Sequence, residues 1–306
     1  MKTSETISDL CRAYDEDGYA VLKKVFSEQD VAELRSEAIA ICSGQRGAVG
    51  GVEALNSGNP SPDELMKQVL AVHFPHKVSE RVRATLTQPE IVRFLNAAIG
   101  PDIKCMQSML FIKNAGKPGQ AWHQDEYYIP TRDQSLAGVW IALDDARIDN
   151  GGLWVHPGSH KQGILWPTKK HGDSRFDTSD EAFDFPYERE GGVPLEVDAG
   201  DVVIFHGYLL HRSLNNTRSS GYRRAIVNHV MNARSLLPWS VASRPRTTDD
   251  FRDFEMVSGV DPYAWKGKSD LISCAQVSRW GRLAWCAIST SAHSGRYLHG
   301  RARPRI

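Results

Sequence analysis

The sequence predicts an α+β fold made mainly of β-strands, in which a helical layer packs on a sandwich or jelly roll. Two patterns support this prediction. Apolar side chains recur at helical spacing in about the first 100 residues, whereas from Ile103 onward short apolar runs alternate with turn signals. The chain has 306 residues, of which 41% are hydrophobic and 24% charged, so it can bury a large core.

The clearest helical segment begins at the capping box of Ser27 and Asp30, after which apolar residues follow three or four positions apart. Residues 80–86 and 90–98 show similar spacing, with Pro89 near the start of the second segment. Residues 44–62 are rich in Gly, Ser, Asn and Pro, which predicts a long loop that is mobile or functional. We therefore expect a helical layer over about residues 1–100.

Seven short runs rich in Val, Ile, Leu and aromatic residues follow, separated by turn signals such as Asn150-Gly-Gly152. We expect strands at 103–113, 120–127, 138–143, 152–156, 193–197, 201–206 and 222–231. Residues 169–189 form a charged loop inserted among them. The expected division is one domain over residues 1–238, with the β core at about 101–238, and a C-terminal extension over 239–306 whose place in the fold the pattern leaves open.

Charge and composition narrow the expected partners. Lys plus Arg number 37, and Asp plus Glu also number 37. A chain with zero net charge has no overall positive field to attract nucleic acid or an anionic membrane, so a small-molecule substrate is expected. No leader pattern is visible in residues 1–10 and no run of about 18 apolar residues occurs, which favours a cytoplasmic protein. Reduced thiols are expected, because no C-x-x-C pair occurs among the five cysteines, Cys11, Cys42, Cys105, Cys274 and Cys286.

The common nucleotide, serine-hydrolase and zinc-protease motifs are absent, and a His-x-Asp pair remains as the candidate for chemistry. In the expected strand 120–127, His123 and Asp125 are two residues apart and would point to one face, either as metal ligands or as a mutually satisfied buried pair. Tyr127 shares that face and would line a pocket or pack in the barrel. A second pair, His171 and Asp173, lies in a polar loop and is expected to be solvated.

Two His and one carboxylate on one face of a metal ion leave three adjacent octahedral positions open, as in non-haem Fe(II) oxygenases. Such a site needs one more His from a second strand. His211 is favoured because it is followed by a polar turn, where a strand leaves the barrel mouth. His206 lies inside an apolar run and is expected to be a structural hydrogen-bonding residue, and His229, in mid-strand, is the remaining candidate.

Five blocks of sequence occur in one order over roughly residues 10–235: Trp122-His-Gln-Asp125, 138–144, 150–160, 200–206 with His211, and 221–226. Together they resemble the phytanoyl-CoA dioxygenase family of Fe(II)- and 2-oxoglutarate-dependent oxygenases. The resemblance implies a double-stranded β-helix in which His123, Asp125 and His211 bind iron and Arg223 binds the far carboxylate of 2-oxoglutarate.

A guanidinium suits that role because it grips a carboxylate bidentately and keeps its charge, whereas Arg224 would point to the opposite face. The resemblance also implies positions for Gln107 and Trp140 near the co-substrate or pocket.

The implied activity is hydroxylation of a C–H bond with O2 as oxidant and release of succinate and CO2. Desaturation, epimerisation or cyclisation by the same iron centre is the alternative, as is a non-catalytic or hydrolytic metal-binding jelly roll. Related halogenases replace the carboxylate at Asp125 with a small residue, so its presence favours hydroxylation. Loops 44–62 and 169–189 are expected to decide the substrate, and no clear basic cluster for coenzyme A is visible.

Overall fold

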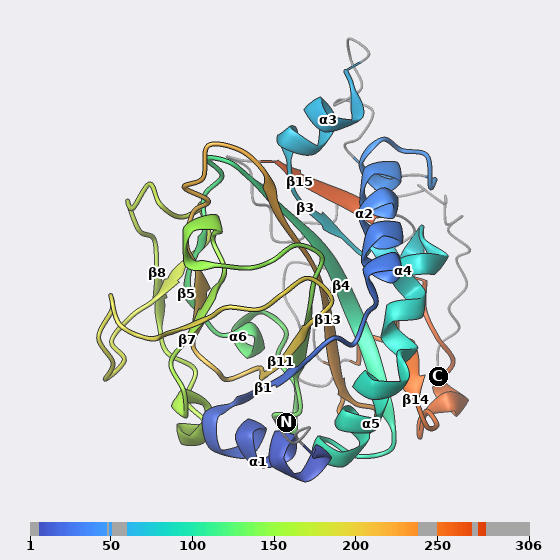
Figure 1. The fold of residues 1–306 in the computed structure, drawn as a ribbon. Coiled ribbons are helices and arrows are strands. Elements are labelled where there is room, and N and C mark those ends of the chain that lie inside the picture. The colour runs from blue at the N-terminus through green and yellow to red at the C-terminus, as the bar shows by residue number, and fades with distance from the viewer. Residues whose placement is uncertain (1–5, 48, 51–59, 238–249, 271–274, 280–306) are drawn as a thin grey trace, which may run out of the picture.

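Two facing sheets form the core of the computed structural model, which describes residues 6–47, 49–50, 60–237, 250–270 and 275–279 (Figure 1). Strand order in the large sheet is β1-β11-β6-β13-β4-β3-β15-β2, and β14 also pairs with β4. These strands are β1 (Tyr19–Leu22), β2 (Val49–Gly50), β3 (Val69–His73), β4 (Ile103–Asn114), β6 (Ala137–Ala142), β11 (Val202–His206), β13 (Tyr222–Asn232), β14 (Glu255–Ser258) and β15 (Ala275–Arg279).

The second sheet has the order β10-β7-β12-β5, and a separate two-stranded sheet pairs β8 with β9. Their bounds are β5 (Gln120–His123), β7 (Leu153–Val155), β8 (Thr168–Lys169), β9 (Glu181–Ala182), β10 (Val193–Leu195) and β12 (His211–Ser213). All pairings among β5, β7, β10 and β12 are antiparallel. The arrangement confirms the predicted α+β class and matches the double-stranded β-helix that the resemblance implies.

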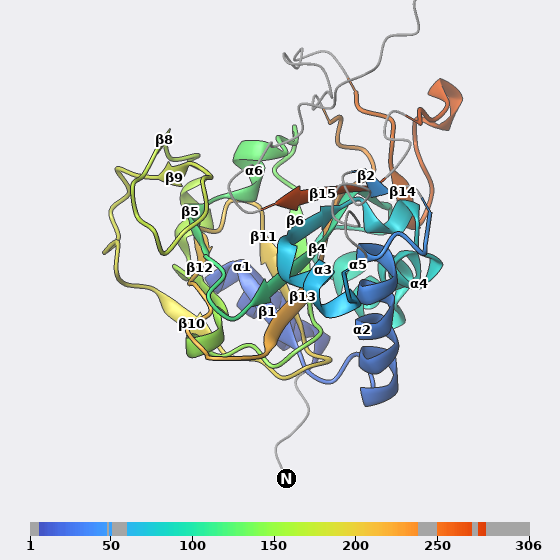
Figure 2. The same ribbon diagram turned by 90° about the horizontal axis from the view of Figure 1, so that it is seen from above.

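Three of the helices, α2, α4 and α5, lie on the side of the large sheet away from the second sheet (Figure 2). The helices are α1 (Ile7–Asp17), α2 (Glu28–Cys42), α3 (Pro62–Gln68), α4 (Glu80–Ala84), α5 (Pro89–Ala98) and α6 (Asp125–Tyr128), with 3-10 turns at Pro75–Lys77, Thr85–Thr87, Ile148–Asn150, Ser159–Gln162 and Ala264–Lys266. The predicted capping box starts α2, where the Asp30 N–H donates to Ser27 Oγ at 3.1 Å.

The alternation of strand side chains divides the core into two layers. On β13, Ile226 and Val230 pack under the helices, whereas Ala225 and Val227 face the interior between the sheets together with Trp140 of β6. Arg223 and His229 also face this interior, and Arg224 lies on the opposite face of β13 from Arg223, as the sequence predicts. Residues that face the interior from β4, β6 and β13 therefore line any site between the sheets.

Two expectations about the elements need correction. The first 100 residues are not only helical, because β1 pairs with β11 and β3 pairs with β4. The strand expected at 120–127 ends at His123, and Asp125 begins α6. In the extension after residue 238, whose place the pattern leaves open, β14 pairs with β4 and β15 with β3.

Other expectations concern membrane spans, the cysteines and the loop at 44–62. Within the described ranges, no helix combines the length and the apolar character that crossing a bilayer requires. Cys11, Cys42 and Cys105 are free thiols, whereas Cys274 and Cys286 lie outside the described residues. Most of the loop predicted at 44–62 lies outside them as well.

Candidate metal centre and its cavity

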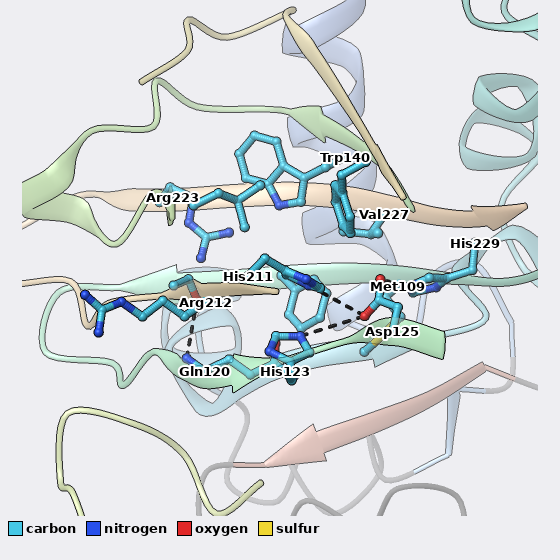
Figure 3. A pocket seen from close by; sticks show the side chains of 14 residues that line it. Met109, Gln120, His123, Asp125, Trp140, His211, Arg212, Arg223, Val227 and His229 are labelled. Carbon is cyan, nitrogen blue, oxygen red and sulfur yellow. Dashed lines mark hydrogen bonds and ion pairs between the residues drawn. The ribbon is translucent and has the colours of Figure 1, made fainter. Parts of the chain in front are cut away.

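His123, Asp125 and His211 meet between the two sheets, each from a different element (Figure 3). His123 ends β5, Asp125 begins α6 and His211 begins β12, directly opposite His123 in the strand register. One ligand atom from each residue lies within 4.8 Å of the others, and all three residues are buried. In the described part of the chain, no other group of three such side chains comes this close.

Backbone carbonyls fix the orientation of both histidines. His123 Nδ1 lies 2.7 Å from the carbonyl oxygen of Ala121, and His211 Nδ1 lies 2.9 Å from that of Leu209. Because a carbonyl only accepts, each Nδ1 carries the proton and each Nε2 keeps its lone pair on the side of Asp125. Burial, reinforced by the neighbouring His211, lowers the pKa of His123 to about 3, so this imidazole is neutral at physiological pH. Neutral imidazoles held in this way are the form that binds metal.

Asp125 presents its two carboxylate oxygens to different partners. Oδ1 lies 3.8 Å from Nε2 of His123 and 3.6 Å from Nε2 of His211. Oδ2 lies 3.2 Å from Nε2 of His229, a buried residue of β13. Burial alone would raise the pKa of Asp125, but the surrounding histidines, foremost His211 and His229, hold it below its ordinary value. An ionised Asp125 with one oxygen tied to His229 offers the other oxygen to a metal ion.

The helical turn at Asp125 changes the reasoning for the residues that follow it. The expected strand alternation from His123 to Tyr127 is wrong, because the chain turns into α6 and brings the Asp125 carboxylate back towards the histidines. Tyr127 is consequently 45% exposed, accepts a hydrogen bond from the Thr168 hydroxyl at 2.9 Å and does not line the cavity. Tyr128 lies closer to the site, with its ring 6.3 Å from that of His123.

The remaining candidate histidines play different parts. His229, considered from the sequence as a possible third ligand, contacts Asp125 instead. His206 accepts a hydrogen bond from the Tyr208 N–H at 3.1 Å, away from the three ligands. In the second His-x-Asp pair, Asp173 forms an ion pair with Arg175 and His171 lies against the ring of Phe176.

A cavity with about 510 Å³ of empty space extends from these ligands between the two sheets. Apolar side chains from both sheets make up much of its wall, and Arg223 lies on it away from Asp125 (Figure 3). The lining residues are Met109, Phe111, Gln120, His123, Asp125, Trp140, Leu153, Phe205, His211, Arg212, Ser213, Arg223, Val227 and His229.

Arg223 is a buried cation that forms no ion pair with any described residue. It is 3% exposed, its guanidinium lies 5.6 Å from the ring centre of Trp140, and its Nε has no hydrogen-bond partner among the described atoms. Burial lowers its pKa to about 10, which leaves it charged at neutral pH. Arg224, on the opposite face of β13, donates to both oxygens of Asp144 at 2.8 Å. A buried, unpaired guanidinium suits a carboxylate ligand entering the cavity.

Two other expected pocket residues differ in their placement. Trp140 lines the cavity next to Arg223. Gln107 is 2% exposed and lies opposite His229 in the register of β4 and β13, but it is not among the lining residues. Ser213 and Met109 also line the cavity, although the sequence patterns did not single them out. The sequence feature that could have predicted Ser213 is its position two residues after His211 on a strand, because strand alternation places both side chains on one face.

The expected loop at 169–189 is fastened to the strands that carry the histidines. We name residues 169–191 the insert. Near its start, the Gly119 N–H donates to the carbonyl of Arg175 at 2.7 Å. Near its end, Trp122 Nε1 and Arg212 Nη1 both donate to the carbonyl of Arg189, at 2.7 and 2.9 Å. Trp122 precedes His123 and Arg212 follows His211, so each of the two histidine-bearing strands holds the insert through a neighbour of its histidine.

Comparison with known proteins agrees with this geometry. A family model described as phytanoyl-CoA dioxygenase (PhyH) matches residues 14–225. Phytanoyl-CoA dioxygenase 1 of Oryza sativa subsp. japonica is 40% identical over 139 residues, which cover 44% of this chain and 47% of that protein. The peroxisomal phytanoyl-CoA dioxygenase of Homo sapiens is 29% identical over 232 residues, or 72% of this chain and 67% of that one. The match therefore spans about half the length of the plant relative.

Solved structures share the fold at low sequence identity. The epimerase SnoN, in complex with Fe3+, alpha ketoglutarate and nogalamycin RO, superposes with a TM-score of 0.60 at 20% identity, covering 83% of this chain and 96% of SnoN. The alpha ketoglutarate-dependent carbocyclase SnoK gives a TM-score of 0.59 at 21% identity, covering 84% of this chain and 100% of SnoK. Because the family model matches more than half of the chain, this protein belongs to the phytanoyl-CoA dioxygenase (PhyH) family, within the iron- and 2-oxoglutarate-dependent oxygenases.

Proposed function

We propose that this protein is an Fe(II)- and 2-oxoglutarate-dependent dioxygenase that hydroxylates a C–H bond of a small molecule and releases succinate and CO2. The observation that carries the proposal is one cavity that combines two kinds of site. Three metal-ligand side chains lie on its wall, and an unpaired, buried guanidinium lies on the same wall away from Asp125. A hydrolytic metal site has no need of the second feature.

In this proposal His123, Asp125 and His211 would hold the iron and leave part of its coordination to other ligands. Arg223 binds the far carboxylate of 2-oxoglutarate through the two parallel hydrogen bonds of its guanidinium, with Trp140 beside it. The bound iron and 2-oxoglutarate supply the activation of O2 that oxidises the substrate.

The chain itself contributes position and exclusion of water. His229 holds one oxygen of Asp125, and backbone carbonyls hold both ring Nδ1 atoms. Apolar side chains screen the cavity on several sides, namely Met109, Phe111, Leu153, Phe205 and Val227. Such a wall strengthens the hydrogen bonds inside it and keeps bulk water from the reacting groups.

The presence of a carboxylate ligand supports hydroxylation, because Asp125 occupies the place that a halide would need. Two of the structural neighbours are described as an epimerase and a carbocyclase. Epimerisation and cyclisation by this chain are therefore alternative outcomes that the test must separate. We place the activity in the cytoplasm on the sequence prediction, although the human relative is described as peroxisomal.

The test is O2-dependent turnover of 2-oxoglutarate by the purified protein with Fe(II). We expect slow succinate formation without a prime substrate, and none in His123→Ala. Iron binding without any such turnover would favour the non-catalytic or hydrolytic alternative. Once a substrate is found, labelled O2 distinguishes the outcomes. Succinate takes up one labelled oxygen in every case, whereas the product of the prime substrate gains label in hydroxylation and not in desaturation or epimerisation.

A further inference from the structure

A second buried cation lies beside Arg223. Lys113 of β4 is directly opposite Arg223 of β13 in the strand register, and it is 5% exposed. Burial, together with the charge of Arg223, lowers the pKa of Lys113 well below its ordinary value. Two like charges placed side by side away from water are costly unless something compensates them.

The Lys113 amine has three acceptors around it. Nζ lies 2.9 Å from Ser213 Oγ, 3.3 Å from the carbonyl of Gly151 and 2.5 Å from that of Leu214. A neutral amine has two N–H donors and one lone pair, which would face an acceptor here. Three acceptors match the three N–H groups of a charged ammonium.

Gly151 makes room for this ammonium. Its φ is +81°, and a Cβ at this position would lie 2.7 Å from Cδ and 2.9 Å from Nζ of Lys113, and 2.4 Å from the carbonyl oxygen of Leu214. The turn signal Asn150-Gly-Gly152 therefore has a second reason for its central glycine, besides the backbone conformation. The turn before β7 therefore leaves space for the Lys113 side chain.

Lys113 determines what the Ser213 hydroxyl can do. Ser213 Oγ accepts from Lys113 Nζ and from the Gln120 N–H at 3.3 Å. A hydroxyl oxygen has two lone pairs, so both are occupied and its own hydrogen points elsewhere. Ser213 lines the cavity near Arg223, and no described residue accepts that hydrogen. The hydroxyl is left as a donor that faces the cavity.

The charges around this point do not balance within the described chain. Asp177 lines a smaller adjoining cavity together with Lys113, Ser213 and Arg223. It is the carboxylate that raises the pKa of Lys113, against the larger effects of burial and of Arg223, and Arg223 itself has no ion pair among the described residues. Asp144 also raises the pKa of Arg223, but this carboxylate is already paired with Arg224. The two buried cations therefore share one remaining carboxylate, Asp177, and an anionic ligand would balance the excess positive charge.

We propose that Lys113 is a positioning residue for the far carboxylate of the co-substrate, holding Ser213 as a donor beside Arg223 and adding a second positive charge. This inference rests on the proposed function. It means that selectivity for a dicarboxylic 2-oxo acid depends on the pair Arg223 and Lys113 rather than on Arg223 alone.

The matched control is Lys104, another fully buried lysine of β4, whose Nζ donates to the carbonyl of Ser235 at 2.5 Å, away from the cavity. Calorimetry under anaerobic conditions with Mn(II) would measure binding of 2-oxoglutarate and of 2-oxobutyrate, which lacks the far carboxylate. Lys113→Met should weaken 2-oxoglutarate binding about tenfold or more, the loss expected for a hydrogen bond to a charged group. Its affinity for 2-oxobutyrate should stay within about twofold of wild type, and Lys104→Met should bind both acids as wild type does.

Ser213→Ala extends the test to the case in which Lys113→Met does not fold. It should lose affinity for 2-oxoglutarate but not for 2-oxobutyrate, and the double variant should bind no more weakly than Lys113→Met. Equal weakening of both acids in Lys113→Met, or wild-type binding of 2-oxoglutarate by either single variant, would overturn the inference. If wild-type protein binds no 2-oxoglutarate at all, the proposed function fails instead.

Discussion

The cavity contains two groups of polar side chains that are built in different ways. The metal-ligand group is His123, Asp125 and His211, and the cation group is Arg223 and Lys113. At the metal-ligand group, each histidine is fixed by a carbonyl two residues before it, on strands of four and three residues. At the cation group, Arg223 and Lys113 come from the two longest strands, β13 and β4, and only the pairing of those strands brings them together. The metal ligands thus depend on local backbone geometry, whereas the cations depend on register.

The largest effect should come from removing a metal ligand. His211→Ala should lower iron affinity and 2-oxoglutarate turnover by more than about 100-fold, because even supporting residues around metal ligands cost about 10–100-fold. Metal content and succinate formation are the measurements. His206→Ala is the control and should keep its iron. The opposite pattern, with His206 needed and His211 dispensable, would assign the third ligand to His206.

The next effect concerns the cation group alone. Arg223→Lys keeps the charge but loses the two parallel hydrogen bonds, at a cost of about 1.5–3 kcal/mol, so the KM for 2-oxoglutarate should rise roughly 10- to 150-fold. Iron affinity should not change. Arg224→Lys, on the outer face with Asp144, should leave this KM near wild type. Sensitivity at Arg224 and not at Arg223 would show that the register of β13 is shifted by one residue.

His229 tests whether the metal-ligand group also needs support from β13. His229→Asn removes the contact with Asp125 Oδ2 and should weaken iron binding about tenfold, the lower end of the range for residues that orient a ligand. 2-Oxoglutarate affinity at saturating metal should be retained. His76→Asn is a matched control, since His76 is a buried histidine paired with Ser108 elsewhere in the fold. Identical iron affinity in the His229 and His76 variants would mean that Asp125 is held without β13.

A separate effect concerns acid stability, away from both groups. Burial, then Lys77 and Arg83, lowers the pKa of His76 to about 3. In the unfolded chain His76 takes up a proton below about pH 6.5, whereas in the folded state it does so only near pH 3. Because the unfolded state binds this proton first, the free energy of unfolding falls as the pH drops below about 6.5. Between pH 6.5 and 5 the wild type should lose about 2 kcal/mol more free energy of unfolding than His76→Asn. Urea denaturation measures it, and equal losses in both proteins would refute the assignment.

This contrast also explains what the sequence could predict. His123, Asp125 and His211 lie in short patterns, so their meeting could be expected from the residues and the resemblance. The expected strand geometry at Asp125 is nevertheless wrong, because nothing in residues 120–127 marks the change from β5 to α6. Tyr127 was misplaced for the same reason.

The role of Lys113, in contrast, could not be predicted from a local sequence pattern. Lys113 follows the apolar run 109–112 of a long strand, and its role depends on Arg223, Ser213 and Gly151, which are 38 to 110 positions away. Such a cluster has no local pattern, and only the paired strands reveal it. The strands β1 and β3 were missed on similar grounds, since their partners β11 and β4 lie far along the chain.

The fastening of the insert bears on how this scaffold could be re-engineered. Trp122 and Arg212 bind main-chain carbonyls near Arg189, and these two bonds do not depend on the side chains at that end of the insert. Side chains add to the anchorage, because Arg212 also pairs with Glu190 and Trp122 packs with Phe185. A donor segment that keeps these contacts could be grafted between Asp177 and Arg189 while the histidine-bearing strands stay in place, which suits the insert to libraries that seek new substrates.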